Sequence, residues 1–118
     1  MSQFMLLIRN QGVPMEGLSQ EEIAGHMQKW GAWMGGLGEQ GKLVGGDPFE
    51  HQSAAVLSAN GNNVSDGPHT ESGVTVGGYV TIKAGNLAEA VEIAKGCPAM
   101  ESPTSTIEVR EFMTMPEM

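Results

Sequence analysis

The chain has 118 residues, of which 40% are hydrophobic and 17% are charged, and its formal net charge is −8. This length is typical of a single domain, so we expect one domain over residues 1–118, and no apolar stretch is long enough to cross a membrane. Six basic residues against fourteen acidic ones argue against binding to nucleic acid or anionic lipid, because both depend on clustered lysine and arginine.

The N-terminus and the cysteine content indicate a compartment. The sequence begins Met-Ser-Gln-Phe and enters an apolar run directly, without the basic segment and small-residue cleavage site of a signal peptide. Cys97 is the only cysteine, which excludes an intrachain disulfide and a zinc site made of several thiolates. We therefore predict a cytoplasmic protein.

The first predicted elements are a strand and a helix. A continuous apolar run within residues 3–9 predicts a central strand buried on both faces. Residues 10–18 are rich in glycine and proline and predict a loop. Ser19 and Glu22 are spaced as in a capping box, so the first helix should begin there.

This first helix should run to about Gln40, where Gly41 supplies a C-terminal signal. Its several interior glycines lower its intrinsic stability, so it depends on packing against the rest of the domain. Apolar residues at helical spacing predict its buried face, namely Ile23, Met27, Trp30, Met34 and Leu37.

The middle of the chain predicts short strands. Residues 42–44 form one, which the Gly-Gly-Asp-Pro sequence at residues 45–48 should end. Residues 54–59 predict a strand that enters a hairpin turn at residues 60–63, after which Val64 returns briefly.

The last third predicts a strand, a helix and a strand. Residues 74–82 are β-rich, Asn86 caps a helix that ends at Gly96, and residues 106–110 alternate as a closing strand. The last residues, 114–118, should be frayed. The inward-facing residues of the helix should be Leu87, Ala90, Val91 and Ala94.

Together these elements follow the order β-α-β-β-α-β. The simplest arrangement is an antiparallel sheet with both helices on one face. Such a sheet leaves its other face uncovered, and 118 residues do not supply a third layer. We therefore expect a homodimer that forms by face-to-face contact of the two sheets.

His26 is the first candidate for chemistry. Helical spacing places it on the same face as Ile23, Trp30 and Trp33. A half-buried imidazole beside a carboxylate suits general acid or base catalysis on a small ring compound or a lactone. The alternative is a core histidine that bonds to a backbone carbonyl, and the sequence favours neither.

Other candidates carry a structural alternative beside the functional one. Asp66 precedes Gly-Pro in a turn, where aspartate ordinarily accepts hydrogen bonds from backbone amides. Trp30, Trp33 and Tyr79 can line a pocket for a flat ligand, although aromatic residues at helical spacing more often fill a core or an interface. Cys97 follows a helix C-terminus, so it should behave as a small apolar group.

We expect no metal site, because none of the three histidines, His26, His51 and His69, forms a helical His-x-x-x-His pair with another. We expect no cofactor.

Several short segments, taken in order, resemble the YCII-related family and specifically its DGPF-domain branch. The resemblance covers nearly the whole chain, and it depends on the order and spacing of the segments more than on any one of them. They are Met5-Leu6-Leu7, His26 followed by Trp30, Val44-Gly45-Gly46, Asp66-Gly67-Pro68 with Glu71, Gly77-Gly78-Tyr79, and Cys97-Pro98 before Ile107-Glu108-Val109-Arg110.

The resemblance implies an α+β, ferredoxin-like fold that pairs into a dimeric α+β barrel, with a cleft between sheet and helices. Enzymatic activity is suggested for the family because a helix histidine and an aspartate lie together in that cleft. His26 matches the histidine, whereas Cys97 stands at the position of the aspartate. Asp66 can supply the missing carboxylate, and His69, which replaces the phenylalanine of the motif, is either a second imidazole or a solvated turn residue.

Two functions follow. The first is a small dimeric enzyme that acts on a small organic molecule without a redox cofactor, by a lyase, isomerase or hydrolase step. In this hypothesis His26 is the acid or base, Asp66 is its partner, and Trp30, His69 and Tyr79 contact the substrate. The alternative is a non-catalytic metabolite-binding or regulatory dimer, in which the cleft senses a metabolite or docks another protein.

Overall fold

The computed structural model describes residues 1–11, 18–50 and 52–114. Within these residues the predicted β-α-β-β-α-β order is confirmed, with one hairpin inserted between its second and third strands. The elements are β1 (Ser2–Asn10), α1 (Gln20–Glu39), β2 (Leu43–Pro48), β3 (Ala55–Ser58), the 3-10 turn η1 (Ala59–Gly61), β4 (Asn63–Asp66), β5 (Thr75–Ala84), α2 (Leu87–Lys95), the 3-10 turn η2 (Pro98–Glu101) and β6 (Thr106–Glu111).

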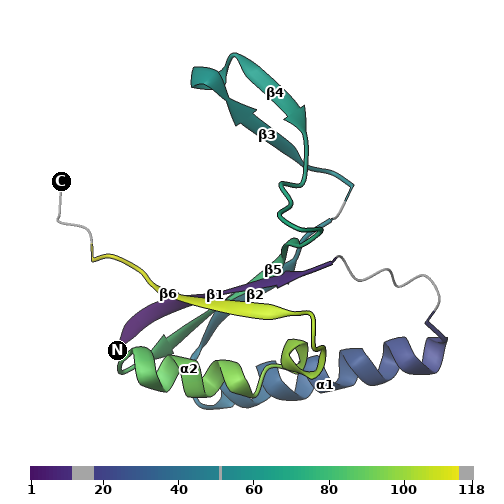
Figure 1. Ribbon diagram of the computed structural model, residues 1–118. Helices are drawn as coiled ribbons and strands as arrows, with labels where there is room; N and C mark the ends of the chain where they lie inside the picture. The colour runs from purple at the N-terminus through teal and green to yellow at the C-terminus, as the bar shows by residue number, and fades with distance from the viewer. Residues whose placement is uncertain (12–17, 51, 115–118) are drawn as a thin grey trace.

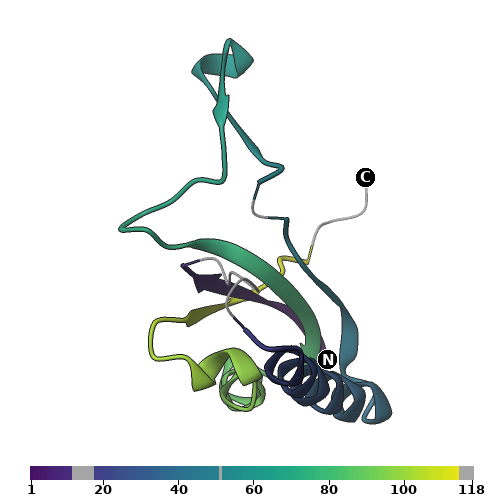
Figure 2. The ribbon, with the colours of Figure 1, turned by 90° about the vertical axis from the view of Figure 1, so that its right-hand side faces the viewer.

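Four strands form one antiparallel sheet in the order β2-β5-β1-β6 (Figure 1). The register places Leu6 of β1 between Val80 of β5 and Val109 of β6. Both helices lie on the same face of this sheet, as the two views in Figures 1 and 2 show. The chain therefore has the predicted α+β, ferredoxin-like fold.

The core lies between the sheet and the helices. Side chains alternate along a strand, so every second residue of β1 and β5 points toward the helices, and Phe4, Leu6 and Ile82 are 0% exposed. Met5 and Leu7 point the other way and are only partly buried. The predicted burial of β1 on both faces is therefore wrong within a single chain, because no second layer covers the other face.

Both predicted helix caps are present. The hydroxyl of Ser19 accepts a hydrogen bond from the Glu22 amide at 3.1 Å, and the side chain of Asn86 accepts one from the Glu89 amide at 2.9 Å. Each cap satisfies a backbone donor that has no partner within the helix. These local contacts fix where α1 and α2 begin.

The predicted inward faces of the helices need correction. Met27 is 63% exposed, and Leu37, at 6%, is the only buried residue among the described side chains of α1. In α2 the inward positions are Ala90 and Ala94, whereas Leu87 is 52% exposed and Val91 is 36% exposed. Helical spacing gives the direction of the apolar face, but the small contact area of each helix leaves the flanking residues in solvent.

Strand β2 is longer than predicted. It continues through the Gly-Gly-Asp-Pro sequence that was expected to end it, and it pairs with β5. A Cβ atom on Gly46 would lie 2.7 Å from the Tyr79 carbonyl oxygen and 3.1 Å from the Val80 Cα. The glycine therefore permits close approach of the two strands and does not break β2.

The predicted hairpin is confirmed, with β3 and β4 paired around η1, and it forms a separate two-stranded sheet. It extends away from the main sheet on the side opposite the helices (Figures 1 and 2). Most of the predicted loop over residues 10–18 and of the frayed end over 114–118 lies outside the described residues. Within the described part of the chain, no helix has the length and hydropathy needed to span a membrane.

Candidate functional site

His26 lies on α1 and is partly buried. The indole nitrogen Nε1 of Trp30, one turn along the helix, donates a hydrogen bond to His26 Nε2 at 3.0 Å. Because Nε2 accepts this hydrogen bond, the neutral form of the imidazole carries its proton on Nδ1. Trp30 therefore selects one tautomer of His26.

The aromatic contacts continue along α1. The Trp30 and Trp33 rings meet edge to face, with centroids 5.7 Å apart and planes at 85°, a favourable geometry for aromatic pairs. His26, Trp30 and Trp33 thus form a row of touching rings. The Trp33 end of this row reaches a groove.

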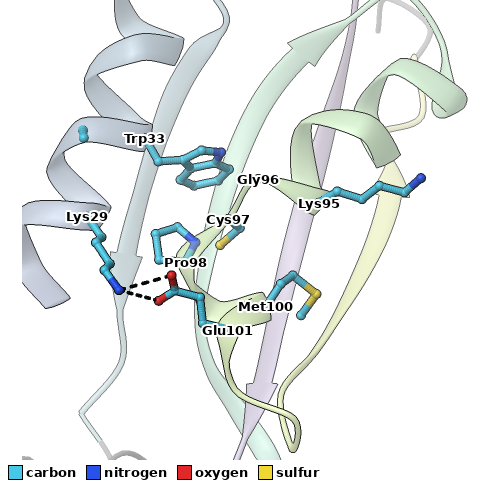
Figure 3. Close-up of a pocket in the computed structure, with 9 residues that line it drawn as sticks. Lys29, Trp33, Lys95, Gly96, Cys97, Pro98, Met100 and Glu101 are labelled. Atoms are coloured by element: carbon cyan, nitrogen blue, oxygen red, sulfur yellow. Dashed lines mark hydrogen bonds and ion pairs between the residues drawn. The ribbon is translucent and has the colours of Figure 1, made fainter.

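This groove lies between α1, the end of α2 and η2, and has a volume of about 650 Å³. Figure 3 shows the Trp33 ring on one side of it and Cys97 and Pro98 opposite. It opens widely to solvent, and its lining comprises Lys29, Ala32, Trp33, Lys95, Gly96, Cys97, Pro98, Met100 and Glu101.

One ion pair crosses the groove. Lys29 Nζ lies 3.2 and 3.1 Å from the two carboxylate oxygens of Glu101 and thereby joins α1 to η2 (Figure 3). Both side chains are 59% exposed, and exposed ion pairs of this kind are weak. An anionic ligand can therefore compete with Glu101 for Lys29.

Cys97 forms part of the groove wall and of the core, and it is 2% exposed. Burial raises the pKa of its thiol to about 11, although a backbone hydrogen bond involving Ala99 opposes the shift. At neutral pH the thiol is protonated and is a poor nucleophile. The expectation that Cys97 behaves as a small apolar group agrees with this environment.

Asp66 lies far from this groove in the fold. It is the last residue of β4, in the hairpin that extends from the opposite side of the sheet (Figures 1 and 2). Among the described residues, the one hydrogen-bond partner of the His26 side chain is Trp30, and no carboxylate contacts it. Within one chain the structure therefore does not bring His26 and Asp66 together.

Tyr79 also lies on the face opposite the helices, because its register partner Leu7 points there. Its hydroxyl donates a hydrogen bond to Asp47 Oδ2 at 3.2 Å, and its ring stacks on Phe49 with centroids 5.6 Å apart. The hydrogen bond to Asp47, then its negative charge and slight burial, raise the pKa of the Tyr79 hydroxyl.

His69 is 73% exposed, and its Nε2 lies 3.9 Å from a carboxylate oxygen of Glu71. Its carbonyl oxygen accepts a hydrogen bond from the Thr75 hydroxyl at 2.6 Å. These contacts hold the backbone of the turn and leave the imidazole in solvent. His51 lies outside the described residues, and the described part of the chain contains no cluster of three potential metal ligands.

The predicted site residues thus divide between two places. His26 and Trp30 lie on α1, the helix that forms one wall of the groove, whereas Tyr79, His69 and Asp66 belong to the open face or to the hairpin region above it. Sequence reasoning missed Lys29 and Glu101, which are separated by 72 positions and meet only in the folded chain. It also missed Asp47, because the strand that carries it was predicted to end.

Comparison with known proteins assigns the family. The YCII-related domain model matches residues 3–116, so the chain belongs to the YCII-related family. No curated protein matches its sequence. Among solved structures it is similar to 5-chloro-2-hydroxyhydroquinone dehydrochlorinase from Burkholderia phenoliruptrix AC1100 in complex with 2,5-dihydroxybenzoquinone, with a TM-score of 0.51, 16% identity, and coverage of 94% of this chain and 93% of that one. A likeness at that identity shows the shared fold.

Proposed function

We propose that this protein is a small-molecule enzyme that transfers a proton with His26 and needs no redox cofactor. The substrate binds in the groove between α1 and η2, beside the aromatic row of His26, Trp30 and Trp33. The observation that carries this proposal is the 3.0 Å hydrogen bond from Trp30 to His26, because it orients the imidazole on α1, the helix that forms one wall of the groove.

The tautomer assigns the roles of the two nitrogens. Nδ1 carries the proton of the neutral ring and donates a hydrogen bond to a substrate oxygen. Nε2 accepts a proton as a general base once the Trp30 indole gives up its hydrogen bond. The step is a lyase, isomerase or hydrolase reaction on a small ring compound or lactone.

The solved relative supports the choice of a ring compound. That protein is a dehydrochlorinase of a hydroxylated aromatic ring and is seen with a quinone. The same fold hosts many reactions, so it supports the substrate class by analogy. Trp33, at the end of the aromatic row, offers a flat surface to such a ring, and Lys29 offers a cation to its oxygen atoms.

We also propose that the working form is a homodimer in which the uncovered faces of the two sheets meet. Met5 and Leu7 point to that face and are only partly buried, and Phe49 on its border is 53% exposed. Asp66, together with the proposed ligand contacts of His69 and Tyr79, enters the enzyme hypothesis only through this assembly. The single buried cysteine supports a reducing, cytoplasmic location.

The alternative, a metabolite-binding or regulatory module, is favoured by two observations. No carboxylate of the described residues orients His26, and the groove presents a protonated thiol, Cys97, in its wall. A site without an acid–base partner binds a ligand as readily as it transforms one.

Turnover and binding of hydroxylated quinones and small lactones distinguish the two functions. With a substrate that is turned over, we expect His26→Ala to lower kcat/KM at least 100-fold, a typical effect of a general acid or base. Trp30→Phe should change the pH dependence of kcat, because it removes the hydrogen bond to Nε2 and keeps the ring. The matched control is Gln28→Ala, an exposed neighbour on α1.

Binding without turnover would contradict the enzyme proposal, provided that His26→Ala binds the same compound as well as the wild type does. That result would establish the groove as a binding site and leave His26 with a structural role.

A further inference from the structure

The hairpin of β3, η1 and β4, residues 55–66, which we call the arm, has apolar side chains that are exposed to solvent. Leu57 is 65% exposed and Val64 is 63% exposed, and the register places them directly opposite each other. Only Val56 in the arm is partly buried. An exposed apolar cross-strand pair on a two-stranded ribbon is marginally stable by itself.

The composition of the arm differs from that of an ordinary solvated hairpin. Residues 55–65 carry no charged side chain, although 17% of the whole chain is charged. Both strands are edge strands, and proteins usually protect such edges with lysine or other charges, proline, or bulges. Residues 55–65 contain none of these charges and no proline, so this ribbon is suited to contact with another protein surface.

The two strands of the arm are joined to each other at its base. The Gly67 amide donates a hydrogen bond to the Ala54 carbonyl oxygen at 2.9 Å. A Cβ atom on Gly67 would lie 2.9 Å from the Ala54 Cβ, so only glycine permits this contact. The base of the arm is therefore closed, and the radius of gyration, 16.1 Å, exceeds the roughly 13.5 Å typical of a compact domain of this length, as expected for a projecting arm.

We propose that this arm is a dimerisation arm, which packs Leu57 and Val64 against a second copy of the chain. The arm rises from the same side of the sheet as the open face (Figures 1 and 2), so both uncovered surfaces lie on one side of the domain. One twofold rotation covers both of them at once and gives a closed dimer. Because residues 55–65 carry no charged side chain, contact between two arms adds no like-charge repulsion to that between two chains of net charge −8.

This inference deepens the proposed homodimer, and a variant without the arm tests it. Because Ala54 and Gly67 already hydrogen-bond, residues 55–66 can be replaced by Asn-Gly, which closes a two-residue turn. Sedimentation equilibrium gives the dimer dissociation constant, and circular dichroism checks the fold. We expect an intact domain whose dissociation constant rises at least tenfold.

A milder variant keeps the arm and removes its apolar contact. The double substitution Leu57→Ser and Val64→Ser should also weaken the dimer at least tenfold. The matched control is Leu87→Ser with Val91→Ser, an exposed apolar pair on the outside of α2. Its dissociation constant should stay within twofold of the wild type.

Thiol protection supplies a second readout. Native Cys97 is 2% exposed and gives little background reaction, so Leu57→Cys can be followed with a thiol reagent. We expect its reaction rate to fall at least tenfold as the protein concentration rises through the dimer dissociation constant, whereas Leu87→Cys reacts at one rate throughout.

The outcomes separate the proposals. A wild-type dimer whose dissociation constant is unchanged by removal of the arm overturns the arm and leaves the face-to-face dimer standing. A wild type that is monomeric at all concentrations overturns both, even if the arm binds some other protein. Neither result affects the test of His26, which is read from turnover.

Discussion

The two faces of the central sheet differ in how deeply their side chains are buried. On the helix-covered face, Phe4 and Leu6 are 0% exposed and Val80 is 2% exposed. On the open face, Leu7 is only partly buried, and it shares the surface with the ion pair between Arg9 and Glu108 at 2.6 Å. The same strands supply both faces, and alternate side chains determine which environment each residue meets.

Folding of the single chain and assembly of two chains therefore depend on different faces of the sheet. The helix-covered face stabilises the single chain, because it buries apolar surface against α1 and α2. The open face contributes less to the stability of one chain and offers a mixed surface for contact. Side chains on the two faces should therefore respond differently to substitution and to protein concentration.

The largest difference is expected between two adjacent leucines of β1. Leu6→Ala should lower the free energy of unfolding by about 3 kcal/mol, because it leaves a cavity in the core. Leu7→Ala should cost about 1 kcal/mol at low protein concentration, since its side chain is only partly buried. Urea denaturation measures both, and equal losses would show that the open face is covered within one chain.

A smaller difference is expected between two adjacent glycines of β2. Gly46→Ala should destabilise the protein by about 2 kcal/mol, because the new methyl group meets the β5 backbone. Gly45→Ala should change the stability by less than about 0.5 kcal/mol, since nothing lies within 4 Å of its Cβ position. Thermal melts of the pair test whether close approach of β2 and β5 requires a glycine at this one position.

The smallest effect concerns Glu108 on the open face. Hydrogen bonds from Arg9 and then Arg110 lower the pKa of its carboxyl, so the unfolded chain holds this proton more tightly than the folded one. The resulting stabilisation is present above the unfolded pKa and is lost as the pH falls through the folded pKa. The melting temperature of Glu108→Gln should lie slightly below that of the wild type at neutral pH and converge with it in acid.

Arg9→Gln should remove most of the same pH-dependent difference. A difference between Glu108→Gln and the wild type that persists unchanged at low pH would mean that the ion pair is not its source.

Much of the fold was predictable because its signals are local. The caps at Ser19 and Asn86 require only residues a few positions away, and they placed the starts of both helices correctly. The wrong predictions involve contacts between distant segments. Whether Gly46 breaks a strand or permits close approach depends on Tyr79 in another strand, and whether Met27 is buried depends on what packs against α1.

The candidate site shows the same division. The spacing of His26 and Trp30 was sufficient to predict that they share one face of the helix, and the hydrogen bond between the two side chains agrees with that prediction. The link between His26 and Asp66 is not formed within one chain and stays a prediction for the dimer, because a turn motif gives no information on which side of a sheet the turn lies. Lys29 and Glu101 meet only when α1 and η2 pack together.

The sequence by itself determined the order of the elements, the family, the caps of both helices and the face of α1 that carries His26. These depend on periodicity and short-range hydrogen bonds, which neighbouring residues set. Only the tertiary structure decided that the hairpin and the groove lie on opposite sides of the sheet. Side-chain direction across a sheet follows from strand register, and register is fixed by packing between segments that are far apart in the chain.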